Sequence, residues 1–190
     1  MVAALAAGLA LGAMSPPAFA AWDLQQLMDS LAQNKSGRAT FVETKRIAML
    51  DKPLESSGEL VFTAPDRLEK RTLKPRPESM TVTGGELFID RGNQKYHVQL
   101  QAYPQLAAFI DSIRGTLAGD RQALERNYKL SLDGSAGSWS LQLLPLDEKM
   151  QAVVRHIRIS GARDQVKSVE IAQADGDSSL MVIEKSTTAR

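Results

Sequence analysis

Hydrophobic and polar residues alternate with a period of two through most of the chain after residue 37. This is the pattern of strands that bury one face and leave the other in water. The segment from Ser57 to Asp90 shows the organisation well. Its short runs are separated by Ala64-Pro65-Asp66, by Pro75-Arg76-Pro77 and by Gly84-Gly85, which are typical turn sequences. The segment therefore predicts three or four consecutive strands.

The same alternation continues on both sides of this segment. The expected strands cover residues 38–50, 54–63, 67–74, 78–83, 86–90, 94–100, 128–132, 138–144, 153–160, 166–174 and 179–186. Residues 51–53, 133–137 and 145–149 read as the connections between some of them. Turn signals at intervals of about 8–12 residues favour one meandering antiparallel sheet. Strand 67–74 carries only two apolar residues, so we expect one wet face.

Three segments show a helical period instead. Residues 21–34 place Leu24, Leu27, Met28 and Leu31 on one stripe, and residues 103–117 repeat this pattern. A shorter helix is expected over 120–126, with either Gly119 or Asp120 as its cap. The pattern thus predicts a mainly β protein of the α+β class, with one domain over residues 21–190.

The first twenty residues are compositionally different from the rest. Met1 to Ala20 contains no charged residue, and its apolar run from Val2 to Met14 is followed by Ser-Pro-Pro and then Ala18-Phe19-Ala20. An apolar run that ends in an A-x-A sequence is typical of a secretory signal peptide. We expect cleavage near Ala20 and export of the mature chain to the periplasm.

Composition narrows the possible functions. The formal net charge is +1 and aromatic residues make up 5% of the chain, so neither a basic face nor a set of stacking rings favours nucleic-acid binding. There is no cysteine, which excludes disulfides, thiolate metal sites and a cysteine nucleophile.

Few residues suggest chemistry. His97 and His156 both fall in expected strands, and neither has the neighbours of a metal site or of a Gly-x-Ser-x-Gly elbow. The carboxylates at 147–148 and 175–177 fit solvated turns. We therefore expect no enzyme activity, no cofactor and no metal. One basic run, made of Arg67, Lys70, Arg71, Lys74 and Arg76, fits either a solvated strand face or a patch that meets acidic groups.

Several segments, in order, resemble the periplasmic lipoprotein carriers of the LolA-like family. They are Ala39–Lys45, Gly58–Phe62, Pro65–Lys70, Val82–Asp90 and the helix around Phe109. The resemblance covers nearly the whole mature chain and rests on order and spacing. It implies an open half-barrel of antiparallel strands covered by a few helices. It also implies that the protein shields the acyl chains of a lipoprotein, or of another acylated lipid, in transit from the inner to the outer membrane.

The same resemblance implies a lining for such a cavity and a set of partners. The expected lining residues are Leu60, Phe62, Met80, Val82, Leu87, Ile89, Phe109, Ile110 and Ile113, of which the last three belong to the covering helix. The alternative is that these residues form a closed, dry core. The partners would be the acylated cargo, an inner-membrane donor complex and an outer-membrane acceptor, and the protein would act as a monomer.

Three positions depart from the family pattern. Lys70 stands where the family usually has an aromatic residue, and Glu69 stands where an arginine that helps to hold the lid shut is common. Asp90 replaces a common tyrosine. These departures indicate a divergent branch, whose cargo could be a glycolipid or another acylated lipid.

Two other functions remain open at this point. One is a sheet-based adaptor of an envelope complex without lipid cargo, which would show a packed core and an exposed apolar patch. The other is a periplasmic hydrolase built around His97 or His156, which would show a polar cleft.

Overall fold

The computed structural model describes residues 22–185, so the expected signal peptide lies outside the described residues. All of the strands in this range join in one sheet of eleven. They are β1 (Ser36–Arg46), β2 (Leu54–Thr63), β3 (Arg67–Lys74), β4 (Glu78–Thr83), β5 (Glu86–Arg91), β6 (Gln94–Gln99), β7 (Tyr128–Ser135), β8 (Ser138–Pro145), β9 (Val154–Ala162), β10 (Gln165–Gln173) and β11 (Ser178–Lys185). Helices are α1 (Leu24–Leu31), α2 (Pro104–Ala118), α3 (Arg121–Glu125) and α4 (Glu148–Gln151), with a 3₁₀ turn, η1, at Leu100–Ala102.

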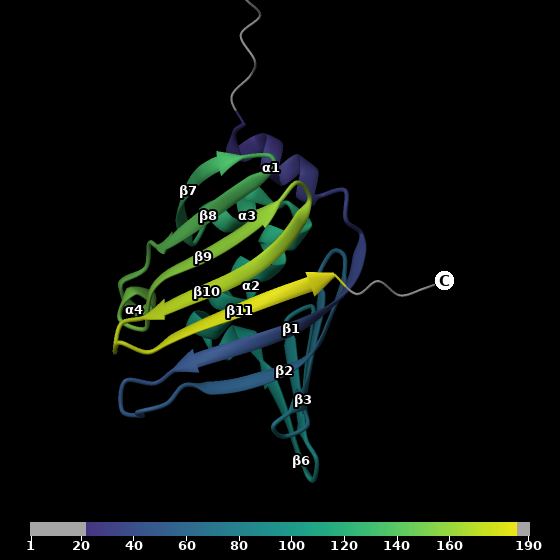
Figure 1. Cartoon of the computed structure of the whole chain (residues 1–190), viewed down its shortest axis with the longest axis vertical. Coiled ribbons are helices and arrows are strands. Elements are labelled where there is room, and N and C mark those ends of the chain that lie inside the picture. The colour runs from purple at the N-terminus through teal and green to yellow at the C-terminus, as the bar shows by residue number, and fades with distance from the viewer. Residues whose placement is uncertain (1–21, 186–190) are drawn as a thin grey trace, which may run out of the picture.

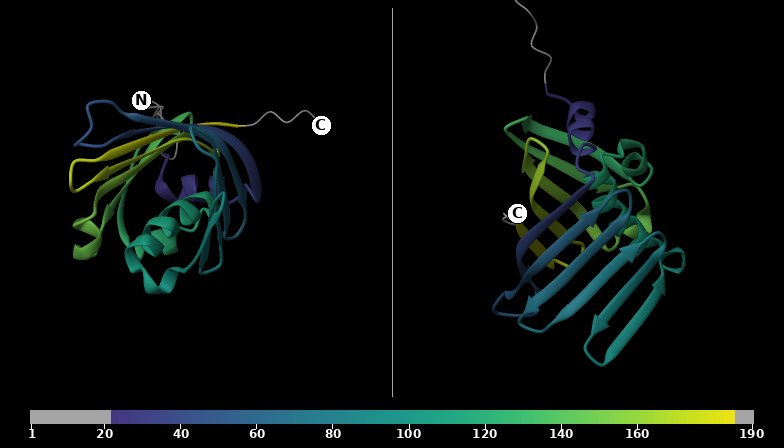
Figure 2. Two further views of the ribbon diagram at one scale, coloured as in Figure 1. Left: turned by 90° about the horizontal axis from the view of Figure 1, so that it is seen from below. Right: turned by 90° about the vertical axis from the view of Figure 1, so that its right-hand side faces the viewer.

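The sheet is a meander in two halves. Its strand order is β6-β5-β4-β3-β2-β1-β11-β10-β9-β8-β7, and the antiparallel pairing of β1 with β11 joins the halves. The end strands β6 and β7 do not pair with each other, so the sheet stays open. Figure 2 shows that it curves around α2, which lies in its hollow. Figure 1 looks onto the opposite, convex side. The fold is the open half-barrel covered by helices that the sequence predicted.

Local sequence sets the ends of the helices. Asp23 caps α1, since its carboxylate accepts a hydrogen bond from Gln26 N at 2.8 Å. In return, the Gln26 side chain accepts a hydrogen bond from Asp23 N. Pro104 occupies the first turn of α2, where a missing N–H costs nothing. Gly119 ends α2 with φ of +67°, a conformation that favours glycine. Asp120 caps α3 through Ala123 N at 2.9 Å, which decides between the two expected caps.

Buried side chains form two clusters on the concave side of the sheet. The larger lies between α1, α3 and strands β7 to β10, with Leu27, Trp139 and Ile157 at its centre. The smaller lies between α2, η1, β4 and β5, and its buried members are Val82, Leu87, Leu100 and Ile110. Helix α2 therefore closes one half of the hollow, while α1 fills the other.

Three expected boundaries were wrong. β1 ends at Arg46, and residues 47–50 form a turn closed by a hydrogen bond from Leu50 N to Ile47 O at 2.9 Å. The expected loop 133–137 is mostly strand, because Gly134 has φ of +99° and packs where a Cβ would lie 2.2 Å from Ser138 O. The connection 145–149 contains the first residues of α4, which Asp147 caps.

Candidate functional site

The strand register places all six expected cavity residues of the sheet on its concave, inner face. Two rows run across β2 to β6. One row contains Leu60, Lys70, Met80, Ile89 and Tyr96, and the other contains Phe62, Leu68, Val82, Leu87 and Val98. Lys70 is the only charged residue in these two rows, and nearer the end of the same face Glu78 pairs with Arg91.

Helix α2 brings the three remaining expected residues against this face. Ile110 is buried in the smaller cluster, and Phe109 contacts both clusters. Ile113 packs against the larger cluster. Seven of the nine predicted residues therefore belong to or pack against these two clusters, whereas Leu60 and Phe62 share the inner face but belong to neither cluster. In this structure α2 packs directly on β4 and β5.

Two hydrogen bonds hold α2 in place. Arg114 donates from Nη1 to Gly84 O, at the β4–β5 turn, over 2.6 Å. Tyr128 donates its hydroxyl hydrogen to Ala108 O over 3.1 Å, and burial raises the pKa of Tyr128 to about 12. The phenol therefore stays protonated and able to donate at any physiological pH. Within residues 22–185, these two side-chain hydrogen bonds supplement the apolar packing of α2 on the sheet.

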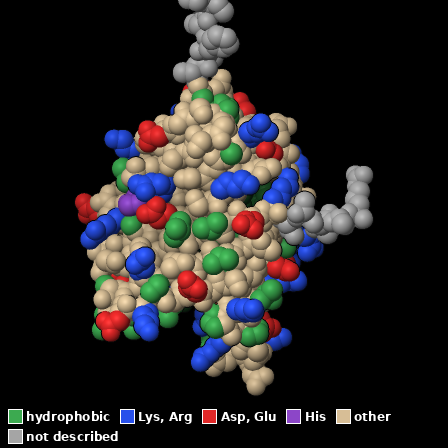
Figure 3. Space-filling view, viewed as in Figure 1, with side chains coloured by type: hydrophobic (Ala, Val, Ile, Leu, Met, Phe, Trp, Pro, Cys, Tyr) green, Lys and Arg blue, Asp and Glu red, His purple; other side chains and the backbone are tan. Residues whose placement is uncertain are grey.

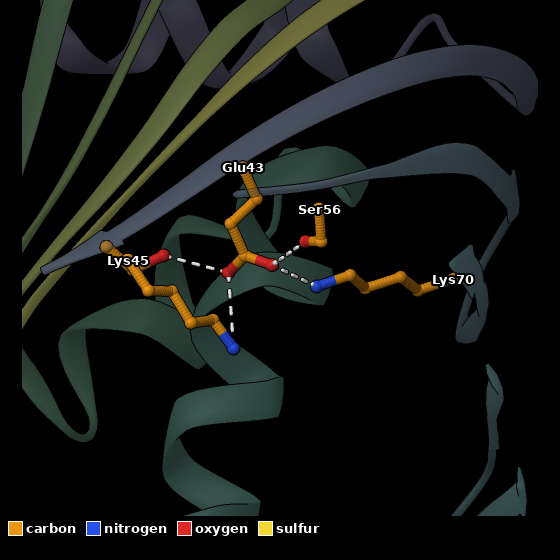
Figure 4. A network of polar contacts seen from close by, with 5 residues as sticks. Glu43, Lys45, Ser56 and Lys70 are labelled. Carbon is orange, nitrogen blue, oxygen red and sulfur yellow. Dashed lines mark hydrogen bonds and ion pairs between the residues drawn. The ribbon is translucent and has the colours of Figure 1, made fainter. Parts of the chain in front are cut away.

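A buried ion pair lies at the centre of the inner face, between the two halves (Figure 4). Only 5% of Glu43 is exposed, and its carboxylate accepts hydrogen bonds from Lys70 Nζ at 2.6 Å and from Ser179 Oγ at 2.8 Å. Ser56 Oγ lies 3.4 Å and Lys45 Nζ 3.6 Å from the same carboxylate. The network joins β1, β2, β3 and β11.

The expectation of a solvated basic run was wrong at Lys70. Its side chain turns inward, 24% exposed, and its ammonium lies 4.9 Å from the ring centre of Phe41. Arg67 and Arg71 do face outward, where both pair with Glu69. Because Glu69 lies on the outer face, it cannot touch α2.

The absence of a side chain at Gly58 leaves space beside the contact between Phe41 and Lys70. A Cβ on Gly58 would lie 1.9 Å from Arg71 O and 3.0 Å from the Phe41 ring. The register between β2 and β3 also shifts at this point, between Ser57 and Gly58. A side chain at position 58 would therefore force β2 away from β3 beside the contact between Phe41 and Lys70.

The charge state of Glu43 sets a pH dependence. Burial by itself would raise its pKa, but the hydrogen bond and charge of Lys70, with Lys45 and Ser179, outweigh burial and lower the pKa below 4.5. A carboxylate whose pKa is lower in the folded than in the unfolded protein stabilises the fold at pH values above the unfolded-state pKa. This stabilisation is lost as the pH falls through the folded-state pKa. We expect this contribution to stay constant from about pH 5 upward and to fade below about pH 4.

Urea unfolding of the wild type and of Glu43→Gln across this range checks the expectation. The difference in unfolding free energy between the two should be constant near neutrality and should narrow in acid. A difference that does not change with pH would show that folding leaves the pKa of Glu43 unchanged, which would contradict a lowered pKa.

The two histidines lie on the outer face and far apart in the sheet. His97, on β6, stacks on Phe88 with ring centres 4.6 Å apart and lies 3.1 Å from Glu86. His156, on β9, has Glu170 as its nearest carboxylate, at 4.0 Å. Among residues 22–185, no three side chains of the metal-ligating types stand together. Neither histidine faces the hollow that α2 covers.

Sequence reasoning missed Phe41, Glu43 and Tyr128 as parts of this site. One signal was available, because the alternation in 38–50 puts Phe41 on the same face as Glu43 and Lys45. A charged residue on an otherwise apolar strand face indicates a buried partner when the sheet is not solvated there. The partner itself, Lys70, lies 27 residues away in sequence and depends on strand register.

The open antiparallel sheet that curves around a covering helix places this protein in the class of helix-covered half-barrels. A comparison with known families then identifies the family. Residues 15–189 match the family described as "Outer membrane lipoprotein carrier protein LolA-like". The chain belongs to this LolA-like family. The description is that of a carrier and not of an enzyme. No curated protein matches the chain.

Solved structures with a similar fold are distant in sequence. A LolA superfamily protein from Nitrosomonas europaea is 10% identical, with a TM-score of 0.47 over 88% of this chain and 93% of that one. MucB in the Pseudomonas aeruginosa MucA/MucB complex is 18% identical, also with a TM-score of 0.47, and the match covers 88% of this chain and 56% of that one. The lipoprotein LppX of Mycobacterium tuberculosis is 8% identical, with a TM-score of 0.46 over 88% and 94%.

Proposed function

We propose that this protein carries the acyl chains of a lipoprotein, or of another acylated lipid, between the inner and outer membranes. It would receive the cargo from an inner-membrane donor complex and give it to an outer-membrane acceptor. One observation carries the proposal: apolar residues of β2, β4 and β5 share the inner face of the sheet, and α2 packs its own apolar residues on those of β4 and β5. Cargo would displace α2 and take its place on the inner face.

The energetics suit a carrier without its own energy source. Burying a methylene is worth about 0.8 kcal/mol, so a chain of roughly 14 methylenes gains on the order of 11 kcal/mol on leaving water. A membrane offers nearly the same gain. Transfer between membrane and protein is therefore close to balanced, and donor and acceptor can set its direction.

Export fits this role. The sequence predicts cleavage of a signal peptide near Ala20, which would place the mature chain in the periplasm. None of the helices in residues 22–185 is long and apolar enough to cross a bilayer.

Acylated peptides test the proposal. A diacylated or triacylated peptide at saturating concentration should raise the melting temperature of the purified mature protein by several degrees, because it binds only the folded state. The same peptide without its acyl chains serves as the control and should have no effect. Equal shifts with both peptides, or no shift with either, would contradict acyl-chain binding.

A second function, that of an adaptor in an envelope complex, has one observation in its favour. The outer face carries a depression of about 320 Å³ over β1, β2 and β11, bordered by the exposed side chains of Val42, Leu73 and Val182. Figure 3 shows hydrophobic side chains near the middle of this face. The peptide experiment separates the two functions, because an adaptor would not discriminate between acylated and unacylated peptides.

A further inference from the structure

The hairpin between β1 and β2 presents three apolar side chains to solvent at one end of the sheet. Met49 is 94% exposed, Leu50 is 49% exposed and Leu54 is 50% exposed. Single apolar residues are common on protein surfaces, but three within six residues at the tip of a hairpin are not. Figure 1 shows this hairpin at the same end of the sheet as the neighbouring turn between β10 and β11.

The hairpin is held in place by its neighbours. Ala48 N donates to Asp177 Oδ1, in the β10–β11 turn, over 2.8 Å. Leu50 N donates to Ile47 O over 2.9 Å, which closes a tight turn at the tip. The apolar tip is therefore displayed on a fixed support, so its exposure is a property of the fold.

Basic residues flank the apolar tip. Segments 45–55 and 74–78, which belong to adjacent hairpins, contain five basic side chains, Lys45, Arg46, Lys52, Lys74 and Arg76, and three acidic ones, Asp51, Glu55 and Glu78. On the other side of the hairpin, the carboxylates of Asp175 and Asp177 accept backbone hydrogen bonds. At the position of this hairpin, Figure 3 shows hydrophobic and basic side chains together with an acidic one.

The hairpin also continues into the candidate site. Leu54 pairs with Lys45 in the register of β1 and β2, and both lie on the inner face. Lys45 in turn lies 3.6 Å from Glu43, at the centre of that face. The exposed tip therefore forms part of the rim of the hollow that α2 covers.

We propose that the 46–54 hairpin is a membrane-docking element that inserts Met49 and Leu50 into the interface of an anionic bilayer. Apolar side chains that enter the acyl boundary beside basic residues that meet lipid phosphates are the combination that peripheral membrane segments use. Docking by this rim would bring the mouth of the hollow to the membrane surface. The proposal stands independently of cargo binding, since it concerns the free protein.

The absence of cysteine makes a direct test available. Met49→Cys is labelled with an environment-sensitive fluorophore, and the control is Leu180→Cys, a 44% exposed position on the outer face of the sheet. With vesicles of phosphatidylglycerol and phosphatidylcholine, we expect a blue shift and quenching by brominated lipid tails at position 49 and neither at position 180. Equal signals at both positions, or no signal at 49, would overturn the proposal.

Co-sedimentation of the unlabelled protein measures the size of the effect. Met49→Glu combined with Leu50→Glu should lower the vesicle-bound fraction about tenfold, whereas Leu180→Glu should leave it unchanged. Arg46→Gln combined with Lys52→Gln should lower binding to anionic vesicles roughly tenfold and binding to pure phosphatidylcholine little. If the glutamate pair leaves vesicle binding intact but abolishes self-association or binding to a partner protein, the hairpin is a protein interface and the proposal is wrong.

Discussion

Phe109→Glu is expected to abolish the melting-temperature shift caused by acylated peptide while the protein stays folded. Phe109 contacts both buried clusters from α2, so it sits at the middle of the layer where the acyl chain would lie. The substitution removes apolar contact worth about 2 kcal/mol and adds a carboxylate that the chain would have to desolvate. Together these effects lower affinity by at least about a hundredfold.

The same change at Phe88 provides the matched control. Phe88 is 43% exposed and lies on the outer face, where it stacks on His97. Phe88→Glu should bind acylated peptide like the wild type. Circular dichroism and the melting temperature without ligand check the fold, and Phe109→Ser offers a milder variant if the glutamate destabilises α2. Normal peptide binding by both Phe109 variants would mean that the cargo does not lie under α2.

Lys70→Met is expected to destabilise the protein by about 2 kcal/mol. The change leaves the Glu43 carboxylate, whose side chain is 6% exposed, without its closest cation. The expected loss is below that for a fully buried pair, because Lys70 is partly solvated and Lys45 remains 3.6 Å from the carboxylate. Urea unfolding at neutral pH measures the loss.

Two further variants define what the pair contributes. Lys70→Met combined with Glu43→Leu removes both charges. This double variant should be only about 1 kcal/mol less stable than the wild type, because apolar residues can replace a buried pair. Lys95→Met is the surface control: its pair with Asp90, at 3.4 Å, is solvated, and its loss should cost less than about 0.5 kcal/mol. A double variant as unstable as Lys70→Met would show that packing, and not an unpaired carboxylate, causes the loss.

Local sequence was enough to predict most of the fold. Turn residues and alternation located all eleven strands, because turn sequences separate them and most strands bury one face more than the other. The failures have local causes. Ile47 and Met49 continue the alternation past Arg46 although the backbone turns there, and Gly134 reads as a loop residue although it lies within β7.

The candidate site was harder to predict, because it depends on which strands become neighbours. The apolar residues of β2 to β5 could be assigned to one face from alternation, and the register confirms that they share it. The Glu43–Lys70 pair could not be found this way, since it needs the relative positions of β1, β2 and β3. Lys70, which departs from the family pattern in sequence, proves to be part of the only inward-facing ion network at the sheet centre within residues 22–185.

Mass spectrometry of an organic extract of the protein tests the central claim most directly. The mature protein is purified from the periplasm without detergent, extracted and compared with the Phe109→Glu variant prepared in the same way. Acyl-chain carriage predicts an acylated lipid or lipoprotein in near-stoichiometric amount with the wild type, and a large loss of it with the variant. An extract free of acylated molecules, from a protein whose melting temperature acylated peptides also fail to raise, would contradict the claim.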